Sequence, residues 1–420
     1  MNTWNKPIRV AEGNTFSSIG VTADPKEDRN RVLRIQINHL ELTESLIGRF
    51  QNERASVVTV PTFVEKDLSL RVKVGDACGL TCTFCHNEGV PVSSDNRNLL
   101  PLSPFKEGTS PIWKDGGKSG RRSIYSKTNG VNFLSDLVEP DAEFVAALNA
   151  IREVFGTTEI HLTGGEPTLH PRVAGIVRAA TENGYVVGMT SNGENPKAIP
   201  PSAAMGLDRV NFSIFGTTPQ ELAEVQNEKF RNEKLAEVKL RSLARSIDAA
   251  LSNGVKASAN IVVVNHDHIP RVHRLLEQYS SEVSVRLLNS LDDGQASIDA
   301  IHQIFADLNA KPVANYVTAG VSGARTVYEL PDKRRIHFKK IRTVRLPDTC
   351  QGCSLNNPVD CQEGYYGMRL YKAMGGGYVV GICIQRMDLV MPVSEFVNSP
   401  RCQEVLDFRE QEYQELTAAK

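Results

Sequence analysis

The sequence of 420 residues lacks several features that would place it in a specialised class. It has no run of about 18 apolar residues, which excludes a membrane-spanning helix on sequence grounds. Its formal net charge is −1, so the overall charge gives no reason to expect a nucleic-acid coat or a binder of acidic membranes. The first residues contain no basic segment followed by an apolar one. We therefore expect no signal peptide and a cytoplasmic protein.

Cysteine is also scarce, yet three of the eight cysteines fall close together, at Cys78, Cys82 and Cys85. In a cytoplasmic protein, clustered cysteines are more often metal ligands or redox groups than disulfide partners. Three thiolates on one short loop can hold three corners of a 4Fe–4S cluster and leave one iron open. The alternative is a zinc site with His86 or a distant cysteine as the fourth ligand. The spacing favours the iron–sulfur cluster.

The rhythm of apolar residues predicts an α/β protein. Strand patterns alternate with helix patterns from Leu68 to Asn289 in about six βα units, fewer than the eight of a full TIM barrel. We therefore predict a partial (β/α)6 TIM-like barrel over residues 67–290, with a loop-rich insertion at 89–135. An N-terminal extension at 1–66 precedes the barrel, and a smaller domain at 291–420 follows it.

That last segment contains a second set of cysteines, Cys350, Cys353, Cys361 and Cys383, in a glycine-rich setting. Four thiolates can ligate a complete second cluster, and a zinc site made only of cysteines is the alternative. Cys402 lies on a predicted terminal helix that begins after Ser399. We expect a buried thiol there, or a replacement for Cys361 if that residue is not a ligand.

Seven Lys or Arg residues lie between Lys333 and Arg345, on a predicted pair of strands. The default interpretation is a solvated strand face. The alternative is a phosphate-binding face at the mouth of the barrel, with Arg342 and Arg345 as bidentate ligands of a substrate phosphate.

Two motifs resemble the signatures of the radical S-adenosylmethionine (SAM) superfamily. The first is the cysteine loop, with Phe84 just before its last cysteine, and the second is LTGGEP at residues 162–167. The resemblance covers roughly residues 68–289. It implies that SAM chelates the open iron and that the GGE backbone lies close to the amine of SAM. The cofactor-binding residues implied by the resemblance are Phe84, Gly164, Gly165, Glu166, Pro167, Ser191, Asn192, Ser213, Asn260 and Arg286. For Asn260 and Arg286, a polar residue that merely lines the barrel is an equal alternative.

The resemblance also implies a reaction. A reduced cluster would cleave SAM to a 5′-deoxyadenosyl radical, which would abstract hydrogen from the substrate, with flavodoxin or ferredoxin as electron donor. The late cysteines resemble the auxiliary-cluster extensions called twitch and SPASM, and with the basic run they resemble the GTP cyclase group of molybdopterin synthesis. The cysteine spacing differs from that group, and the chain ends LTAAK instead of in two glycines.

The favoured substrate is a small nucleotide, nucleoside or sugar phosphate from a biosynthetic pathway. The first alternative is a radical SAM enzyme that modifies a peptide. The second is a non-catalytic iron–sulfur or zinc protein, which would leave the GGEP motif and the six βα units unexplained. The neutral overall charge argues against a nucleic-acid partner.

Overall fold

Six parallel strands form the centre of the protein in a computed structural model that describes residues 35–37, 60–82, 90–91, 135–226, 228–358, 361–373, 375–384, 386 and 389–418. They lie side by side in the order β10-β9-β8-β7-β6-β3. Their bounds are β3 (Ser69–Lys73), β6 (Glu159–Thr163), β7 (Val186–Ser191), β8 (Leu207–Ile214), β9 (Lys256–Val263) and β10 (Val283–Asn289). The α/β fold with a partial parallel barrel is therefore confirmed, and its hydrogen-bonded sheet is not closed.

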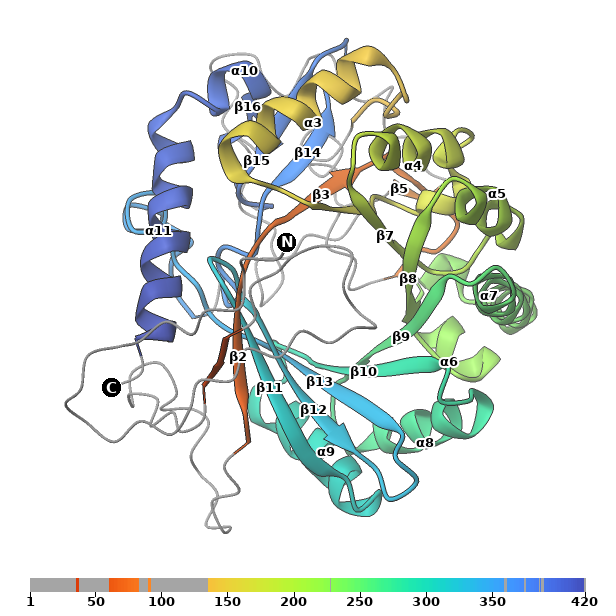
Figure 1. The fold of residues 1–420 in the computed structure, drawn as a ribbon. Helices are drawn as coiled ribbons and strands as arrows, with labels where there is room; N and C mark the ends of the chain where they lie inside the picture. Colours follow the sequence, from red (N-terminus) through yellow and green to blue (C-terminus); the bar gives the residue numbers. More distant parts are fainter. Residues whose placement is uncertain are drawn as a thin grey trace, which may run out of the picture.

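Helices cover the outer side of these strands (Figure 1). They are α3 (Ala142–Phe155), α4 (Val173–Glu182), α5 (Ile199–Ala204), α6 (Pro219–Glu224), α7 (Glu233–Ser252), α8 (Ile269–Gln278) and α9 (Gly294–Asp307). Four short 3-10 helices accompany them: η2 (Pro167–Leu169), η3 (Pro196–Ala198), η4 (Glu228–Phe230) and η5 (His266–His268). Local sequence sets the ends of the helices. Asp141 caps α3 by accepting a hydrogen bond from the Phe144 N–H, and Gly156 ends the helix with a φ of 64°.

Within the described residues, the sheet continues past β10 into five more strands. β13 (Arg335–Ile341) pairs in parallel with β10, and β12 (Gly323–Glu329) and β11 (Lys311–Ala319) follow it in antiparallel order. β2 (Thr62–Lys66) then pairs in parallel with β11, and β1 (Ile35–Ile37) lies at the edge. The sequence predicted the β12–β13 pair but not β11.

At the other edge, β14 (Arg369–Lys372) pairs in parallel with β3. β15 (Tyr378–Gly381) and β16 (Met391–Pro392) continue from it in antiparallel order. A separate short pair, β4 (Ala77–Cys78) and β5 (Val90–Pro91), contains the first cysteine. The rest of the predicted insertion, from residue 92 to residue 134, lies outside the described residues.

Only Asp67 and Leu68 separate β2 from β3, although the two strands pair with opposite halves of the sheet. This short covalent link brings the two halves together, so that the strands follow a ring-like course (Figure 1). The terminal helix α11 (Pro400–Thr417) lies against the link, because Arg409 Nη1 donates to the backbone oxygens of Asp67 and Phe155, each at 2.9 Å. The predicted cap is confirmed, since Ser399 accepts a hydrogen bond from the Cys402 N–H. The short helix α10 (Val393–Phe396) precedes it.

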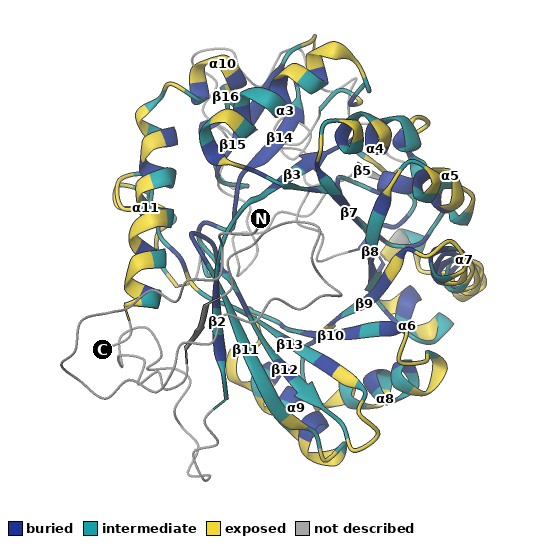
Figure 2. Ribbon diagram, in the orientation of Figure 1, coloured by how far each residue is buried: buried dark blue, intermediate teal, exposed yellow. Residues whose placement is uncertain are grey.

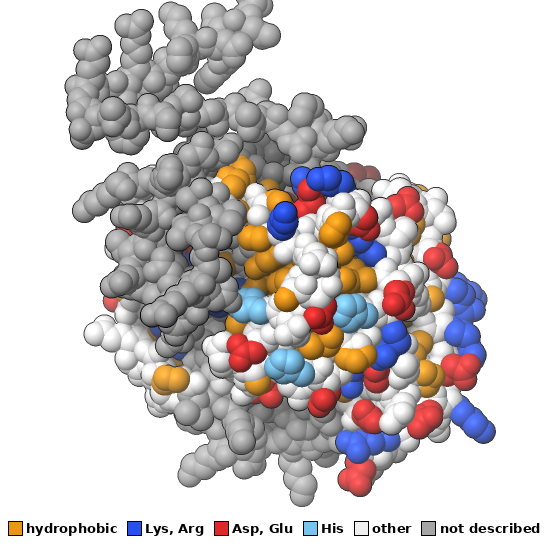
Figure 3. All heavy atoms as spheres, turned by 90° about the horizontal axis from the view of Figure 1, so that it is seen from below, with side chains coloured by type: hydrophobic (Ala, Val, Ile, Leu, Met, Phe, Trp, Pro, Cys, Tyr) orange, Lys and Arg blue, Asp and Glu red, His pale blue; other side chains and the backbone are white. Residues whose placement is uncertain are grey.

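The buried positions run along the strands and on the sides of the helices that face them (Figure 2). One apolar cluster extends from Leu70 of β3 to Val405 of α11 and so joins the barrel to the last helix. The limits of the three predicted domains stay a prediction. Within the described residues, no helix is both long and apolar enough to span a membrane. On the face seen from below in Figure 1, the described residues carry acidic and basic side chains intermixed (Figure 3).

Candidate active site

The GGE turn after β6 is packed directly against the strand that leads into the cysteine loop. The Gly165 N–H donates to the Gly75 oxygen at 2.9 Å, and the Glu166 N–H donates to the Ala77 oxygen at 2.7 Å. A Cβ atom on Gly165 would lie 2.3 Å from the Ala77 oxygen, and one on Gly164 would lie 2.4 Å from the Gly75 oxygen. Neither position can carry a side chain without moving backbone. The two glycines therefore hold the turn and the cysteine strand together.

The Glu166 carboxylate connects this turn to the end of β7. Its Oε1 accepts hydrogen bonds from the Thr168 N–H at 2.9 Å, the Thr168 hydroxyl at 2.6 Å and the Ser191 hydroxyl at 2.7 Å. Its Oε2 accepts from the Asn192 N–H at 2.6 Å. Burial raises the pKa of Glu166, although these donors favour the charged carboxylate. Pro167 begins η2 and is buried beside it. The structure thus brings together Glu166, Ser191 and Asn192, whose role in cofactor binding stays a prediction.

Two residues at the end of β7 reach the cysteine loop itself. Asn192 Nδ2 lies 3.5 Å from Cys78 Sγ. The Glu194 carboxylate accepts the Gly79 N–H at 2.9 Å and forms an ion pair with Lys239 of α7. A Cβ on Gly79 would overlap that carboxylate, so a larger residue there would have to displace the Glu194 side chain. Sequence reasoning missed Glu194 and Lys239, because nothing in "SNGEN" or in an amphipathic helix marks such a long-range contact.

A pocket opens beside this contact. It is lined by Leu80, Asn192, Glu194, Ser213, Phe215, Gly216, Leu222, Lys239, Leu240 and Leu243. Its walls combine apolar side chains with a few polar groups. Ser213, a residue predicted from the sequence, therefore shares a pocket with Asn192, at the edge of the cysteine loop.

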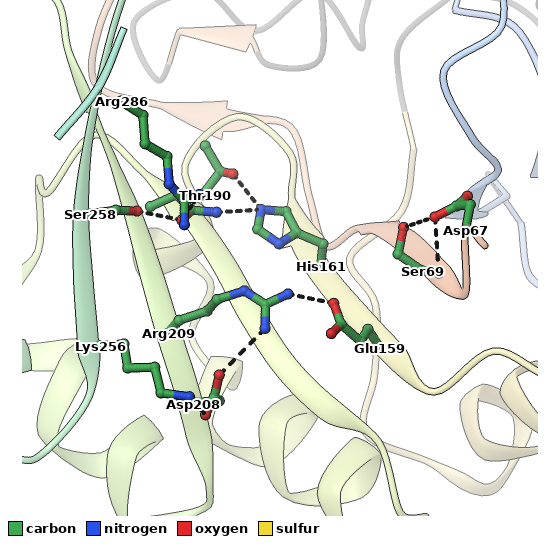
Figure 4. Close-up of polar contacts among 11 residues, drawn as sticks. Asp67, Ser69, Glu159, His161, Thr190, Asp208, Arg209, Lys256, Ser258 and Arg286 are labelled. Carbon is green, nitrogen blue, oxygen red and sulfur yellow. Dashed lines mark hydrogen bonds and ion pairs between the residues drawn. The ribbon is translucent and has the colours of Figure 1, made fainter. Parts of the chain in front are cut away.

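Polar side chains also line the inner face of the parallel strands (Figure 4). His161 Nε2 lies 2.6 Å from the Thr190 hydroxyl and 3.5 Å from Asn211 Nδ2. The Asn211 side-chain oxygen accepts hydrogen bonds from Ser258 at 2.6 Å and from Arg286 at 3.0 Å. Burial and nearby cations hold the pKa of His161 well below its usual range, so the ring is neutral. No motif in the sequence marks His161.

Strand register extends this inner face around the barrel. Arg286 of β10 is paired with Asn260 on one side and His337 on the other. On the opposite wall, Arg71 of β3 is paired with His161 and with Arg369 of β14. Cα partners in parallel strands direct their side chains to the same face. Arg286 and Asn260, both predicted from the sequence, therefore share one surface with residues from the C-terminal strands.

This inner surface is strongly cationic. Burial together with Arg325 and Arg209 lowers the pKa of Arg286 to about 10. Burial and Arg71 lower the pKa of Lys339 to about 8, and burial lowers that of Arg369 to about 9. For Arg286, both charged groups that shift its pKa are cations. Such a group of buried cations favours an anionic occupant.

On the same surface, the buried atoms Asn260 Oδ1 and His337 Nδ1 have no hydrogen-bond partner among the described residues. Burial lowers the pKa of His337 to about 3, so its ring is neutral. A buried polar atom without a partner is costly, and it commonly marks a position that a ligand or water completes.

The two arginines predicted to bind substrate phosphate are occupied by protein groups. Arg342 Nη1 lies 2.7 Å from the Glu412 carboxylate, and its Nη2 donates to the Val321 oxygen at 2.7 Å. Arg345 Nε donates to the Asn356 side-chain oxygen at 2.6 Å. The phosphate role of Arg342 and Arg345 stays a prediction, but the groups of the basic run that face the barrel are His337 and Lys339.

Three of the four late cysteines, Cys350, Cys353 and Cys361, lie near one another. The Cys353 N–H donates to the Cys350 oxygen at 3.2 Å, and the pKa of the Cys361 thiol is raised by burial and, more weakly, by Cys353. Arg386 Nη1 lies 3.6 Å from Cys353 Sγ. Cys383 follows the β14–β15 hairpin. None of the described cysteines is in a disulfide, and Cys402 is 2% exposed within the apolar core.

Phe84, Cys85 and His86 lie outside the described residues, so the complete ligand set of the first loop is not described. Within the described residues, no group of three or more His, Cys, Asp or Glu side chains is placed to hold a metal ion. The donor chemistry of the loop nevertheless fits an iron–sulfur cluster. Side-chain amides of Asn192 and Gln226 donate towards Cys78 Sγ and Cys82 Sγ, as hydrogen bonds to ligating sulfurs do.

Fold and site together define an α/β-barrel enzyme whose site lies at the carboxyl ends of parallel strands. Residues 72–278 match the family model of the radical SAM superfamily. The chain belongs to this superfamily, whose members use a 4Fe–4S cluster and SAM.

Several curated relatives carry one name. The probable GTP 3′,8-cyclase of Aeropyrum pernix is 25% identical over 292 residues, which cover 68% of this chain and 68% of the relative. The probable GTP 3′,8-cyclase of Methanosarcina acetivorans is 23% identical, over 58% of this chain and 60% of the relative. The GTP 3′,8-cyclase of Cronobacter sakazakii is 23% identical, over 56% of this chain and 58% of the relative. The chain thus spans only part of these proteins.

Among solved structures, Streptococcus suis SuiB bound to S-adenosylmethionine is similar, with a TM-score of 0.44 and 12% identity over 89% of this chain and 71% of that chain. QueE from Escherichia coli is also similar, with a TM-score of 0.31 and 14% identity over 63% of this chain and 88% of that chain.

Proposed function

We propose that this enzyme reductively cleaves SAM at a 4Fe–4S cluster held by Cys78, Cys82 and Cys85. When bound, the reduced cluster supplies the electron that splits SAM, and SAM supplies the 5′-deoxyadenosyl radical that removes hydrogen from the substrate. The GGE turn, Ser191, Asn192 and Ser213 would bind SAM next to the loop. Flavodoxin or ferredoxin would be the electron donor.

The observation that carries this proposal is the direct contact between the two motifs. Gly165 and Glu166 donate backbone hydrogen bonds to the strand that ends at Cys78, and Glu166 connects the turn to Asn192, which contacts the Cys78 sulfur. A zinc site or an electron-transfer protein requires the cysteines but not a glycine turn fixed against them. An enzyme that must hold a cofactor between the loop and the turn requires both.

The test is anaerobic reconstitution of the protein with iron and sulfide, followed by incubation with SAM and dithionite. We expect the wild-type protein to form 5′-deoxyadenosine and Cys82→Ala to form none, because the cluster would lose one of its three thiolates. Cys402→Ala, which removes a thiol from α11, is the matched control and should retain product formation. Normal 5′-deoxyadenosine formation by Cys82→Ala would contradict the assignment, and so would zinc in place of iron.

We further propose that Cys350, Cys353, Cys361 and Cys383 hold a second cluster. Burial raises the pKa of Cys350 and Cys361, with Arg345 acting in the opposite direction, and the side chains of the first three affect one another electrostatically. Reconstituted protein should then contain about eight irons per chain, where one cluster alone would give about four. A value near four that is unchanged by Cys353→Ala would remove the second cluster.

The substrate we propose is a small phosphorylated compound of the nucleotide type. The support is the inner surface formed by Arg71, Arg286, Arg325, Lys339 and Arg369, whose buried cations have few acidic neighbours. Arg209, on the same inner face, differs from these cations because its charge is paired with Glu159 and Asp208 (Figure 4). Asp208 also pairs with Lys256. A polyphosphate would supply the missing negative charge.

GTP is a suitable probe, since the curated relatives are named GTP 3′,8-cyclases. Equilibrium dialysis should show that the reconstituted protein binds GTP at least about tenfold more tightly than guanosine, a difference of about 1.4 kcal/mol. Arg286→Gln should remove most of this preference. Lys333→Gln, which removes a positive charge from an exposed position of the same basic run, should not. Equal affinity for GTP and guanosine would contradict a phosphate-binding interior.

A further inference from the structure

Gln226 lies beside the cysteine loop, although nothing in its local sequence marks it. It follows the short helix α6 and forms an isolated antiparallel bridge with Cys82. Only 6% of the residue is exposed. A buried amide requires hydrogen-bond partners for both its oxygen and its nitrogen, so these partners show which way the Gln226 side chain is oriented.

Backbone groups fix the orientation of this amide. Its Oε1 accepts hydrogen bonds from the Thr81 N–H at 2.7 Å and from the Thr81 hydroxyl at 3.2 Å. Its Nε2 donates to the Leu222 oxygen at 3.1 Å. If the two ends exchanged places, the amide nitrogen would face the Thr81 N–H and the amide oxygen would face the Leu222 oxygen. Both contacts would be repulsive, so the donor end is unambiguous.

That donor end also faces a cysteine sulfur. Gln226 Nε2 lies 3.7 Å from Cys82 Sγ, and Asn192 Nδ2 lies 3.5 Å from Cys78 Sγ. The Asn192 amide is fixed in the same way, because its oxygen accepts the Glu194 N–H at 2.9 Å. Two neutral amides from different elements therefore direct N–H groups at two sulfurs of the loop.

We propose that Gln226 is a positioning residue that holds the loop through Thr81 and raises the reduction potential of the bound cluster through its hydrogen bond to the Cys82 sulfur. This inference rests on the proposed function. A reduced cluster carries one more electron, part of it on the sulfurs, so an N–H group directed at a ligating sulfur stabilises the reduced form more than the oxidised one. Because an amide does not titrate, the effect should not depend on pH.

The informative substitution is Gln226→Glu. A carboxylate still accepts both Thr81 hydrogen bonds, and the iron content checks that the loop keeps its anchor although the second carboxylate oxygen would face the Leu222 oxygen. It loses the N–H group that faces Cys82 and adds negative charge, and both changes oppose reduction. Gln220→Glu is the matched control, since it makes the same change on an exposed position of α6, where Gln220 bonds only to Glu224 among the contacts described.

The measurement is the midpoint potential of the cluster, obtained by an EPR-monitored redox titration of reconstituted protein without SAM. We expect Gln226→Glu to retain its iron and to shift the one-electron equilibrium at least about tenfold towards the oxidised form, or about 59 mV. Gln220→Glu should match the wild type. Equal potentials for the three proteins, with full iron content, would overturn the inference and leave the proposed function intact.

A second measurement covers the case in which Gln226→Glu does not fold. Pulsed EPR of the wild-type reduced cluster, with glutamine side chains labelled with 15N, should show a nitrogen coupling that changes with the label. Absence of that coupling would overturn the inference. Wild-type protein that binds no iron would overturn the proposed function, and this inference with it.

Discussion

Lys339 offers the sharpest test of the cationic interior, because its charge should change within an accessible pH range. Burial, and after it Arg71, lowers the pKa of Lys339 from 10.5 to about 8, while Glu363 acts in the opposite direction. The ammonium group is therefore charged below about pH 8 and neutral above it. An anion bound beside it would favour the charged form and raise its pKa again.

The size of the effect follows from linkage. If a bound polyphosphate restored the ordinary pKa of 10.5, its affinity would be constant below about pH 7 and would fall by about 30-fold by pH 9.5. The loss occurs as the pH rises through the folded pKa, because the free protein then has to take up a proton in order to bind the anion. Partial restoration of the pKa would give a smaller change in the same direction.

The assay is equilibrium dialysis of GTP against reconstituted wild-type protein and Lys339→Gln across this pH range. The ionisations of GTP affect both proteins alike, so the ratio of the two affinities reports Lys339 alone. We expect that ratio to be largest at low pH and to approach one at high pH. A ratio that does not vary with pH would refute the placement of the substrate anion beside Lys339.

Three further predictions concern the construction of the site. Gly165→Ala should push the GGE turn away from the cysteine strand, which should cost about 1–3 kcal/mol of folding stability and much of the bound iron. The control is Gly352→Ala, whose Cβ would meet no atom within 4 Å and which should retain its iron in elemental analysis. Arg342→Gln should lower the thermal midpoint, because the buried Glu412 carboxylate would lose its ion-pair partner and keep only the Gly320 N–H among the contacts described, while GTP affinity at low temperature stays unchanged. A specific loss of GTP affinity would instead support the phosphate role predicted from the sequence. Glu166→Gln should lose about 1–3 kcal/mol in chemical unfolding, because a buried amide cannot accept all four hydrogen bonds, and stability equal to the wild type would contradict this account.

Much of the fold could be predicted from the sequence because its signals are local. Apolar periodicity located the six βα units, and the caps at Asp141 and Ser399 set helix ends that depend on neighbouring residues alone. β11 escaped prediction because its residues are mostly half-buried, so the alternation that reveals a strand is weak in KPVANYVTA.

The site was predictable only where a motif marks it. The cysteines and the GGE turn were recognisable, and the contact between them follows from the adjacency of β3 and β6. Gln226, Glu194 and His161 were missed because their roles depend on contacts with residues distant in the chain. Whether Arg342 or Lys339 of the basic run faces the barrel depends on the direction in which each side chain leaves its strand, which the sequence does not reveal.

The short link between β2 and β3 has a consequence for biosynthesis. β2 leaves the ribosome long before its partner β11, because the two strands are far apart in the sequence. Pairings between such distant segments form slowly. The nascent barrel must therefore stay open on one side until β11 has been made, so binding of a metal cofactor before that point would have to occur in an incomplete ring.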